Sequence, residues 1–272
     1  MTEPAILAGS PLFYALLVTI GLAVGTYGTL VGLGGGVILL PILLILFPGA
    51  PPEILTSISL SVVFLNAASG TIAYARQGRI DYHSGILFAL ATIPGTIIGV
   101  WLLKFLEART FNTIFGTLLI IASLFLLSRP RTNGLATNEA STTSERSGSS
   151  RHQVRQVLGS GLSFAVGFIA GLLGIGGGVI HVPMMIYILR FPVHVATATS
   201  HFILVFTALS GVLTHLALGA GFGNWQVVLF IALGIIPGAQ LGALLSRRLR
   251  TTLIVRLLAL ALIVLGLRLL LG

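Results

Sequence analysis

GLGGGVILLP, residues 32–41, is the stretch that decides the fold, because it returns as GIGGGVIHVP at residues 174–183. Each copy places three consecutive glycines and a proline inside strongly apolar sequence. Glycine and proline both interrupt regular helices, so the two copies predict a helix break at the same place in two related segments.

The composition of the chain is that of an integral membrane protein. It has 272 residues with a mean hydropathy of +1.06, and only 8% of them are charged, against about 25% in a soluble domain. Uncharged runs at 54–75, 82–103 and 110–128 approach the ~20 residues that cross a ~30 Å hydrocarbon layer as a helix. Because lipid offers no partner to a free backbone amide, we expect an all-α polytopic protein in a lipid bilayer.

Several other classes are disfavoured by what the chain contains. The N-terminal sequence MTEPAILAGSPLFYALL has no basic residue before its apolar run, so we interpret it as the first membrane span. Cysteine is absent, which excludes disulfides and thiolate metal sites, and we expect neither a metal nor a cofactor. The formal net charge of +9 would suit a nucleic-acid partner, but basic residues gathered in loops indicate membrane topology instead, so no nucleic-acid partner is expected.

The chain is an internal duplication around a polar centre. Beyond the glycine motifs, Thr56 and Ser59 match Thr197 and Ser200, and Gly70 matches Gly211. The polar sequence between the halves carries five arginines and has too little apolar surface to pack. We therefore predict an N-terminal membrane repeat at 1–128, a flexible cytoplasmic linker at 129–156 and a C-terminal membrane repeat at 157–272.

Each half contains about five apolar segments. They are 12–31, 36–47, 54–75, 83–105 and 111–128, then 158–173, 178–190, 196–218, 226–246 and 252–271. An odd number makes the two repeats inverted, and it places twelve of the 15 basic residues on the linker side. Lys and Arg are enriched in cytoplasmic loops. We therefore predict that the linker is cytoplasmic and that both termini lie on the outer side of the cytoplasmic membrane. Segments 36–47 and 178–190 are too short for a full crossing, which predicts broken or half-length helices at the glycine motifs and leaves open whether they cross or re-enter.

The glycine motifs are candidate anion sites. Inverted repeats with interrupted helices are typical of secondary transporters whose substrate lies between the halves. A helix that restarts inside the membrane presents free N–H groups, and glycine lets them approach an anion closely. We assign this role to Gly34, Gly35, Gly36, Gly176, Gly177 and Gly178. For the spaced pairs Gly21/Gly25, Gly28/Gly32, Gly95/Gly99 and Gly238/Gly242, close helix packing is the better interpretation.

Polar side chains follow each glycine motif at the start of an apolar helix. They are Thr56, Ser57 and Ser59 in the first half and Thr197, Thr199, Ser200 and His201 in the second. Their hydroxyls either add donors around an oxyanion or serve as caps and bond back to the preceding turn. Asn66, Thr207 and Gln240 lie deeper in apolar runs, where each needs a partner in another helix or in the substrate.

The ionisable residues point to an anion rather than a cation. All six acidic residues lie in loops or at segment ends, so no carboxylate site for sodium or protons lies at membrane depth. Three histidines do lie inside predicted spans, His181, His201 and His215. Histidine changes charge near neutral pH, so each is a proton-coupling candidate, with His201 favoured beside Thr197 and Ser200; the alternative is a neutral, hydrogen-bonded histidine.

The paired G-x-G-G-G-x-x-x-x-P segments, the TSIS and TATSH clusters, the polar linker and the length together resemble the sulfite exporter TauE/SafE family, also described as 4-toluenesulfonate uptake permeases. The resemblance covers nearly the whole chain. It implies a secondary transporter that moves small sulfur-containing anions, such as sulfite or the organosulfonate sulfoacetate, across the bacterial cytoplasmic membrane by alternating access.

Two other functions are compatible with the sequence. An anion channel would use the same free amides to line a pore. An intramembrane serine protease would use Ser69, which lies in the apolar segment AASG at 67–70, although the chain lacks the G-x-S-G pattern there.

Overall fold

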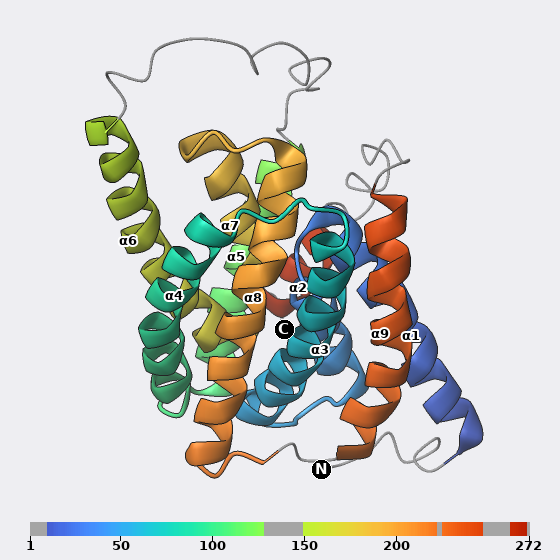
Figure 1. The fold of residues 1–272 in the computed structure, drawn as a ribbon. Helices are drawn as coiled ribbons and strands as arrows, with labels where there is room; N and C mark the ends of the chain where they lie inside the picture. Colours follow the sequence, from blue (N-terminus) through green and yellow to red (C-terminus); the bar gives the residue numbers. More distant parts are fainter. Residues whose placement is uncertain (1–9, 128–148, 222–224, 247–261, 271–272) are drawn as a thin grey trace.

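The computed structural model describes residues 10–127, 149–221, 225–246 and 262–270, and every regular element in this part of the chain is a helix (Figure 1). The elements of the first half are α1 (Pro11–Val31), α2 (Gly36–Leu46), α3 (Pro52–Ala75), α4 (Tyr82–Leu103) and α5 (Ala108–Leu127). Those of the second are α6 (Ser149–Leu173), α7 (Gly178–Pro183), the π-helical turn η1 (Met184–Ile188), α8 (Val193–Ala217), α9 (Trp225–Leu245) and a helical stretch at 262–270. The all-α class is confirmed.

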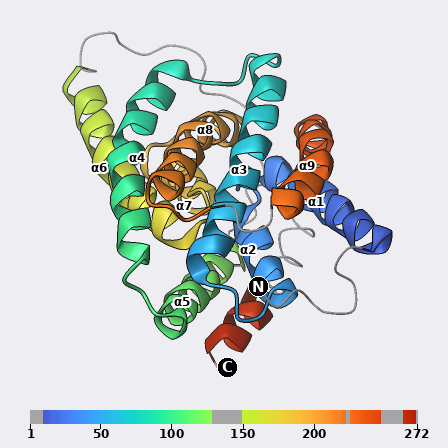
Figure 2. The same ribbon diagram turned by 90° about the horizontal axis from the view of Figure 1, so that it is seen from below.

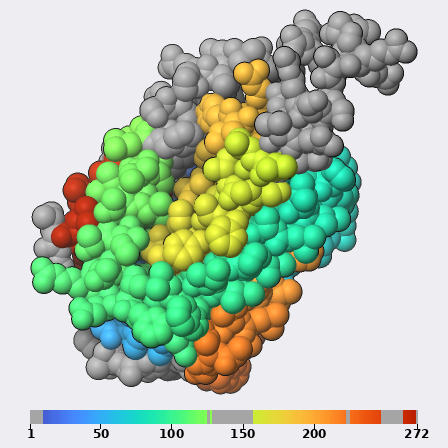
Figure 3. Space-filling model, turned by 90° about the vertical axis from the view of Figure 1, so that its left-hand side faces the viewer, coloured from blue at the N-terminus to red at the C-terminus, as the bar shows by residue number. Residues whose placement is uncertain are grey.

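The helices carry their apolar side chains outward as well as inward. Five of them, α1, α3, α4, α8 and α9, are long and apolar enough to cross a membrane. Figure 3 shows α6 on the surface between α4 and α5. Large apolar side chains such as Leu90, Trp101, Leu124 and Phe164 are exposed on these three helices. A surface of this kind belongs in lipid, so the protein is a multi-pass membrane protein.

Helix breaks occur at both glycine motifs, as predicted. Helix α1 ends at Val31, and α2 begins again at Gly36 and has only 11 residues. In the second half, α6 ends at Leu173, α7 begins at Gly178, and the helix changes to a π-helical turn directly after Pro183. Proline has no N–H to donate to the preceding turn, which is a common cause of such irregularity.

The helices of the two halves are paired reciprocally. The first helix of each half packs against the third long helix of the other half, α1 on α9 and α6 on α4. The long helices α3 and α8 pack on each other in the middle, as Figure 2 shows from below. The last helices also meet, because Gly116 of α5 and Gly266 contact each other's backbone carbonyls.

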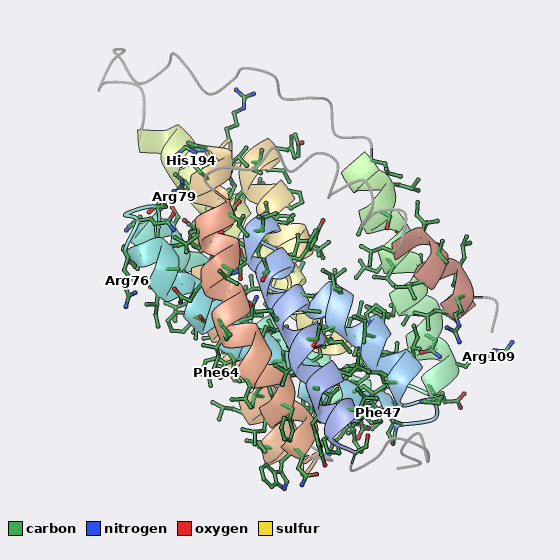
Figure 4. The ribbon with its side chains drawn as sticks, turned by 90° about the vertical axis from the view of Figure 1, so that its right-hand side faces the viewer. Phe47, Phe64, Arg76, Arg79, Arg109 and His194 are labelled. Atoms are coloured by element: carbon green, nitrogen blue, oxygen red, sulfur yellow. The ribbon has the colours of Figure 1, made fainter. Side chains whose placement is uncertain are left out.

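This pairing supports our proposal that the repeats are inverted. In Figure 1, α3 rises from the lower to the upper end, whereas its counterpart α8 descends from the upper end to the lower. Helix α2 runs toward the lower end of the molecule. Phe47, the residue directly after α2, lies in the lower half of Figure 4, and α3 begins shortly after it.

Close approach of paired helices explains most of the spaced glycines. A Cβ built at Gly25 of α1 would lie 2.6 Å from the Ile235 carbonyl oxygen of α9, and one at Gly238 would lie 2.5 Å from the Leu22 carbonyl oxygen. Gly95 and Gly99 of α4 contact the backbone of α6 in the same way. Gly28 differs, because its neighbour belongs to the helix break that follows it and not to another helix. A Cβ built at Gly28 would lie 2.5 Å from the Gly35 amide nitrogen.

Helix α6 begins inside the segment that was predicted to be a linker. The predicted linker ran from 129 to 156, but α6 already begins at Ser149. The sequence at 149–156 contains neither glycine nor proline and includes arginine, glutamine and valine, so nothing in it stops a helix from extending toward the linker. Residues 129–148 of the predicted linker, and 252–261 and 271 of the last predicted segment, lie outside the described residues.

Basic side chains lie near both ends of the molecule. Arg79 and His194 lie toward the upper end of Figure 4, and Arg109 lies in the lower half. Arg79 donates to Ser246 Oγ at the end of α9 over 3.4 Å, whereas Lys104 donates to the Leu218 carbonyl oxygen at the other end, over 2.9 Å.

The α4–α6 contact makes a testable prediction about Gly99. A methyl group there would meet the Phe168 carbonyl oxygen and lie 2.7 Å from the Leu172 amide nitrogen, both fixed backbone atoms. We expect Gly99→Ala to lower the thermal unfolding midpoint by roughly 2–10 °C, since overpacking costs about 1–3 kcal/mol. Gly161→Ala on α6 is the control, because no atom lies within 4 Å of its built Cβ and alanine favours helix. Equal midpoints for the two variants, measured by fluorescence in detergent, would contradict the packing.

Candidate functional site

Each helix break is built by glycines in a backbone conformation that other residues avoid. In the first break, Gly32, Gly34 and Gly35 have φ angles of 84°, 77° and 83°. The corresponding glycines of the second break, Gly174, Gly176 and Gly177, have φ angles of 67°, 78° and 88°. At such angles the Cβ of an L-residue is too close to its own backbone, and glycine has no Cβ. The same turn is therefore built from glycine in both halves.

The third glycine of each triplet serves a different purpose, which is contact between the two breaks. Gly36 and Gly178 are the first residues of α2 and α7. A Cβ built at Gly36 would lie 2.7 Å from the Ile175 carbonyl oxygen, and one at Gly178 would lie 2.7 Å from the Leu33 carbonyl oxygen. The two motifs, 142 residues apart in the sequence, therefore touch in the interior, and all six predicted glycines are buried.

The breaks leave backbone donors free where they meet. Among the described residues, no hydrogen bond uses the N–H of Gly36 or Val37, nor that of Gly178 or Val179. These are the first groups of α2 and α7, which have no carbonyl one turn earlier. Helix N-termini carry partial positive charge, so this is the part of the buried interior that favours an anion.

Two of the predicted hydroxyls reach across to the break of the other half. Ser59 of α3 donates to the Gly174 carbonyl oxygen at 2.7 Å, and Ser200 of α8 donates to the Gly32 carbonyl oxygen at 3.5 Å. The reciprocity follows from the matching positions of the two serines in the repeat. Both bonds fix the carbonyls of the left-handed turns.

Thr56 and Thr197 adopt the back-bonding alternative. Thr56 donates to the Pro52 carbonyl oxygen and Thr197 to the Val193 carbonyl oxygen, each at 2.8 Å and one helical turn earlier. Both side chains nevertheless lie against the opposite break. A Cβ built at Gly174 would lie 2.7 Å from Thr56 Cβ, and one at Gly32 would lie 2.7 Å from Thr197 Cγ2.

A buried chain of hydrogen bonds connects the first break to His201. Asn66 donates from Nδ2 to the Gly34 carbonyl oxygen at 3.0 Å, and its Oδ1 accepts from the Thr29 hydroxyl at 3.1 Å. The Thr29 hydroxyl oxygen lies 3.3 Å from His201 Nε2. Tyr74 adds a bond to the Thr29 carbonyl oxygen and an edge contact with the His201 ring. Asn66 and His201 thus lie in one network that ends on the glycine turn.

The remaining predicted residues lie around this centre with other partners. Ser57 Oγ is buried and has no hydrogen-bond partner among the described residues. Thr199 accepts from the Asp81 amide at 3.0 Å, where the α3–α4 connection ends. His181 lies beside Gly177 with its Nε2 3.2 Å from Ser163 Oγ, and His215 Nε2 lies 3.4 Å from the Thr56 hydroxyl.

Four residues at the centre were not identified from the sequence. Thr29 and Tyr74 belong to the His201 network, and the only available signal was a polar group inside an apolar segment. Val63 and Leu204 contact both glycine breaks but look like ordinary core residues in the sequence. The contacts of Val63 and Leu204 with the breaks depend on how the helices pack, which a local sequence pattern does not show.

Ser69, the candidate nucleophile of the protease reading, makes structural contacts between helices. Its hydroxyl donates to the Ile236 carbonyl oxygen at 2.9 Å and accepts from Gln240 Nε2 at 2.9 Å. Gln240 also donates to the Ser69 carbonyl oxygen, at 2.7 Å. Ser69 and Gln240 therefore connect α3 to α9, as polar side chains in membrane helices commonly do.

A multi-pass helical protein whose halves meet at paired, glycine-lined helix breaks has the architecture of a membrane transporter. The chain belongs to the sulfite exporter TauE/SafE family, whose model matches residues 17–269. It is 33% identical over 265 residues to the probable membrane transporter protein YunE of Bacillus subtilis, covering 93% of this chain and 96% of that one. Probable membrane transporter proteins of Xylella fastidiosa and Methanocaldococcus jannaschii are 28% and 25% identical, and each alignment covers 86–88% of both chains. No solved structure matches.

The unequal lengths of the two serine bonds make a prediction. We expect Ser59→Ala to cost about 1–3 kcal/mol, because it leaves the buried Gly174 carbonyl without its 2.7 Å donor. Ser200→Ala removes a bond of 3.5 Å, at the limit of hydrogen-bond length, and we expect a loss below about 1 kcal/mol. Thermal unfolding of the two purified variants measures the difference. A larger loss for Ser200→Ala would contradict the contacts of the second break.

Proposed function

We propose that this protein is a secondary transporter that carries small sulfur-containing anions, sulfite or organosulfonates such as sulfoacetate, across the cytoplasmic membrane by alternating access. The observation that carries the proposal is the meeting of two helix breaks in the buried centre, each with free N–H groups at a helix start. Family membership supports the sulfur-containing class of substrate.

The charge of the proposed site suits a monoanion. Each helix N-terminus contributes roughly half a positive charge, so α2 and α7 together supply about one. This charge comes from oriented peptide groups, which need no counter-ion when the site is empty. An arginine at the same depth would cost several kcal/mol to bury before any substrate arrived. The proposed binding residues are Gly34, Gly35, Gly36, Thr56, Ser57, Ser59, Asn66, Gly176, Gly177, Gly178, Thr197, Thr199, Ser200 and His201.

The reciprocal contacts provide a route for alternating access. Each break is covered by the other half, through Gly36 on Ile175 and Gly178 on Leu33. Rocking of one half against the other would separate the breaks and expose their amides to one side of the membrane. We further propose that the end carrying Arg76, Arg79 and Arg190 is cytoplasmic, with the linker, and that both termini are outside.

Transport into proteoliposomes tests the proposed function. We expect saturable uptake of labelled sulfite as singly charged hydrogen sulfite, or of a singly charged sulfonate, with a preference over doubly charged sulfate, because the site supplies about one positive charge. Liposomes without protein are the control, and thiosulfate completes the substrate set. Large single-channel currents in planar bilayers would favour the anion channel instead. Absence of flux for every sulfur anion under pH gradients of both signs would overturn the proposal.

Substitution of the buried histidines tests proton coupling. If His201 carries the coupled proton, His201→Gln abolishes the part of the flux that an imposed pH gradient drives, while exchange without a gradient continues. His181→Gln and His215→Gln examine the other two candidates, and His194→Gln, an exposed residue at the start of α8, is the control. An unchanged response to the pH gradient in all three buried variants would remove histidine from the mechanism.

A further inference from the structure

Two aliphatic residues occupy the same place in the two repeats and lie on the central helices. Val63 of α3 and Leu204 of α8 are each four positions after Ser59 and Ser200, the serines that bond across to the opposite break. Both side chains are fully buried, with 0% of their surface exposed. Helices α3 and α8 pack against each other, so the two residues approach one another from the two halves.

Both side chains contact both glycine breaks. A Cβ built at Gly176 would lie 2.6 Å from Val63 Cγ1 and 3.4 Å from Leu204 Cδ2. At Gly34 the order is reversed, with Leu204 Cδ2 the nearest atom and Val63 Cγ1 at 3.6 Å. Val63 also lies over the start of α2, since its Cγ2 is 2.8 Å from a Cβ built at Gly36.

The two residues belong to a small apolar cluster that is separate from the main core. Its buried members are Leu60, Val63, Ala67, Val100, Leu204 and Ala208, from α3, α4 and α8. On α3, Val63 lies about one helical turn from Ser59 and from Asn66, and it lies against the start of α2 at Gly36. Aliphatic side chains cannot bind an oxyanion, so their place between the donors is not explained by substrate binding.

We propose that Val63 and Leu204 form an apolar gate that closes the space between the two glycine breaks and limits the size of the anion that passes. The inference rests on the proposed transport function and adds a residue pair to it. An anion reaches the amides of either break only when the two side chains separate, which occurs when the halves move apart. When they close, they exclude water from the breaks, which prevents ion leakage.

The size limit is tested at mildly acidic pH, where sulfite is singly charged like 4-toluenesulfonate, so that the two substrates differ mainly in bulk. Val63→Ala and Leu204→Ala should each raise the rate of 4-toluenesulfonate relative to sulfite by about tenfold, because removal of methyl groups in such a space is worth about 1–3 kcal/mol. Val62→Ala and Ile203→Ala are matched controls, since each is the fully buried neighbour of a gate residue and belongs to a different apolar cluster. A sulfonate-to-sulfite ratio that is unchanged in both gate variants, while sulfite flux persists, overturns the gate.

A second measurement is independent of the substrate. The chain contains no cysteine, so Ser59→Cys places a single thiol beside the gate. With Val63 and Leu204 intact this thiol should react slowly with a charged thiosulfonate reagent, and Leu204→Ala should accelerate labelling by about tenfold or more, since such truncations remove several kcal/mol of packing. Ile203→Ala should leave the rate unchanged. Equal acceleration by both truncations overturns the gate, and acceleration by Leu204→Ala alone supports it even where no sulfur anion is transported.

Discussion

The contact between the two helix breaks is the constraint on which the rest of the structure depends. Gly36 lies against the Ile175 carbonyl and Gly178 against the Leu33 carbonyl, so neither position has room for a side chain. For these contacts to form, the two halves must interlock, and the exchanged pairs α1–α9 and α4–α6 hold them in place. The glycines that pack α1 on α9 and α4 on α6 bring the backbones close enough for the breaks to meet. One requirement, backbone contact at the centre, thus accounts for glycine at several distant places.

The backbone of the centre is nearly symmetric, but its side chains are not. Asn66 bonds the first break and extends through Thr29 to His201. Its counterpart Thr207 donates to Thr92 instead, at 2.9 Å, and the counterpart of His201 is Leu60. The two breaks therefore offer similar amides to an anion but different side chains, with Asn66 bonded to the first break and His181 beside the second. Such a difference gives the two halves separate roles around a shared site.

The sequence predicted the parts of the fold that depend on composition and on residues with unusual backbone freedom. The breaks at Gly34–Gly36 and Gly176–Gly178, the apolar helices and the packing role of Gly25 and Gly238 all follow from such signals. Other features depend on packing in three dimensions. Residues 149–156 contain neither glycine nor proline, so the sequence does not show whether α6 extends into them. The partner that a serine or threonine hydroxyl chooses depends on its neighbours in three dimensions. Val63 and Leu204 lie in uniformly apolar helices, where periodicity does not show which face meets the breaks.

An experimental structure with bound selenite, the selenium analogue of sulfite, tests the central claim most directly, because anomalous scattering locates selenium without ambiguity. The account predicts one selenium peak between residues 34–36 and 176–178, with its oxygens in contact with the N–H groups of Gly36 and Gly178 and with Val63 and Leu204 displaced around it. Selenium bound only at basic residues near the ends of the helices, with the two breaks still in contact and no anion beside them, would contradict it.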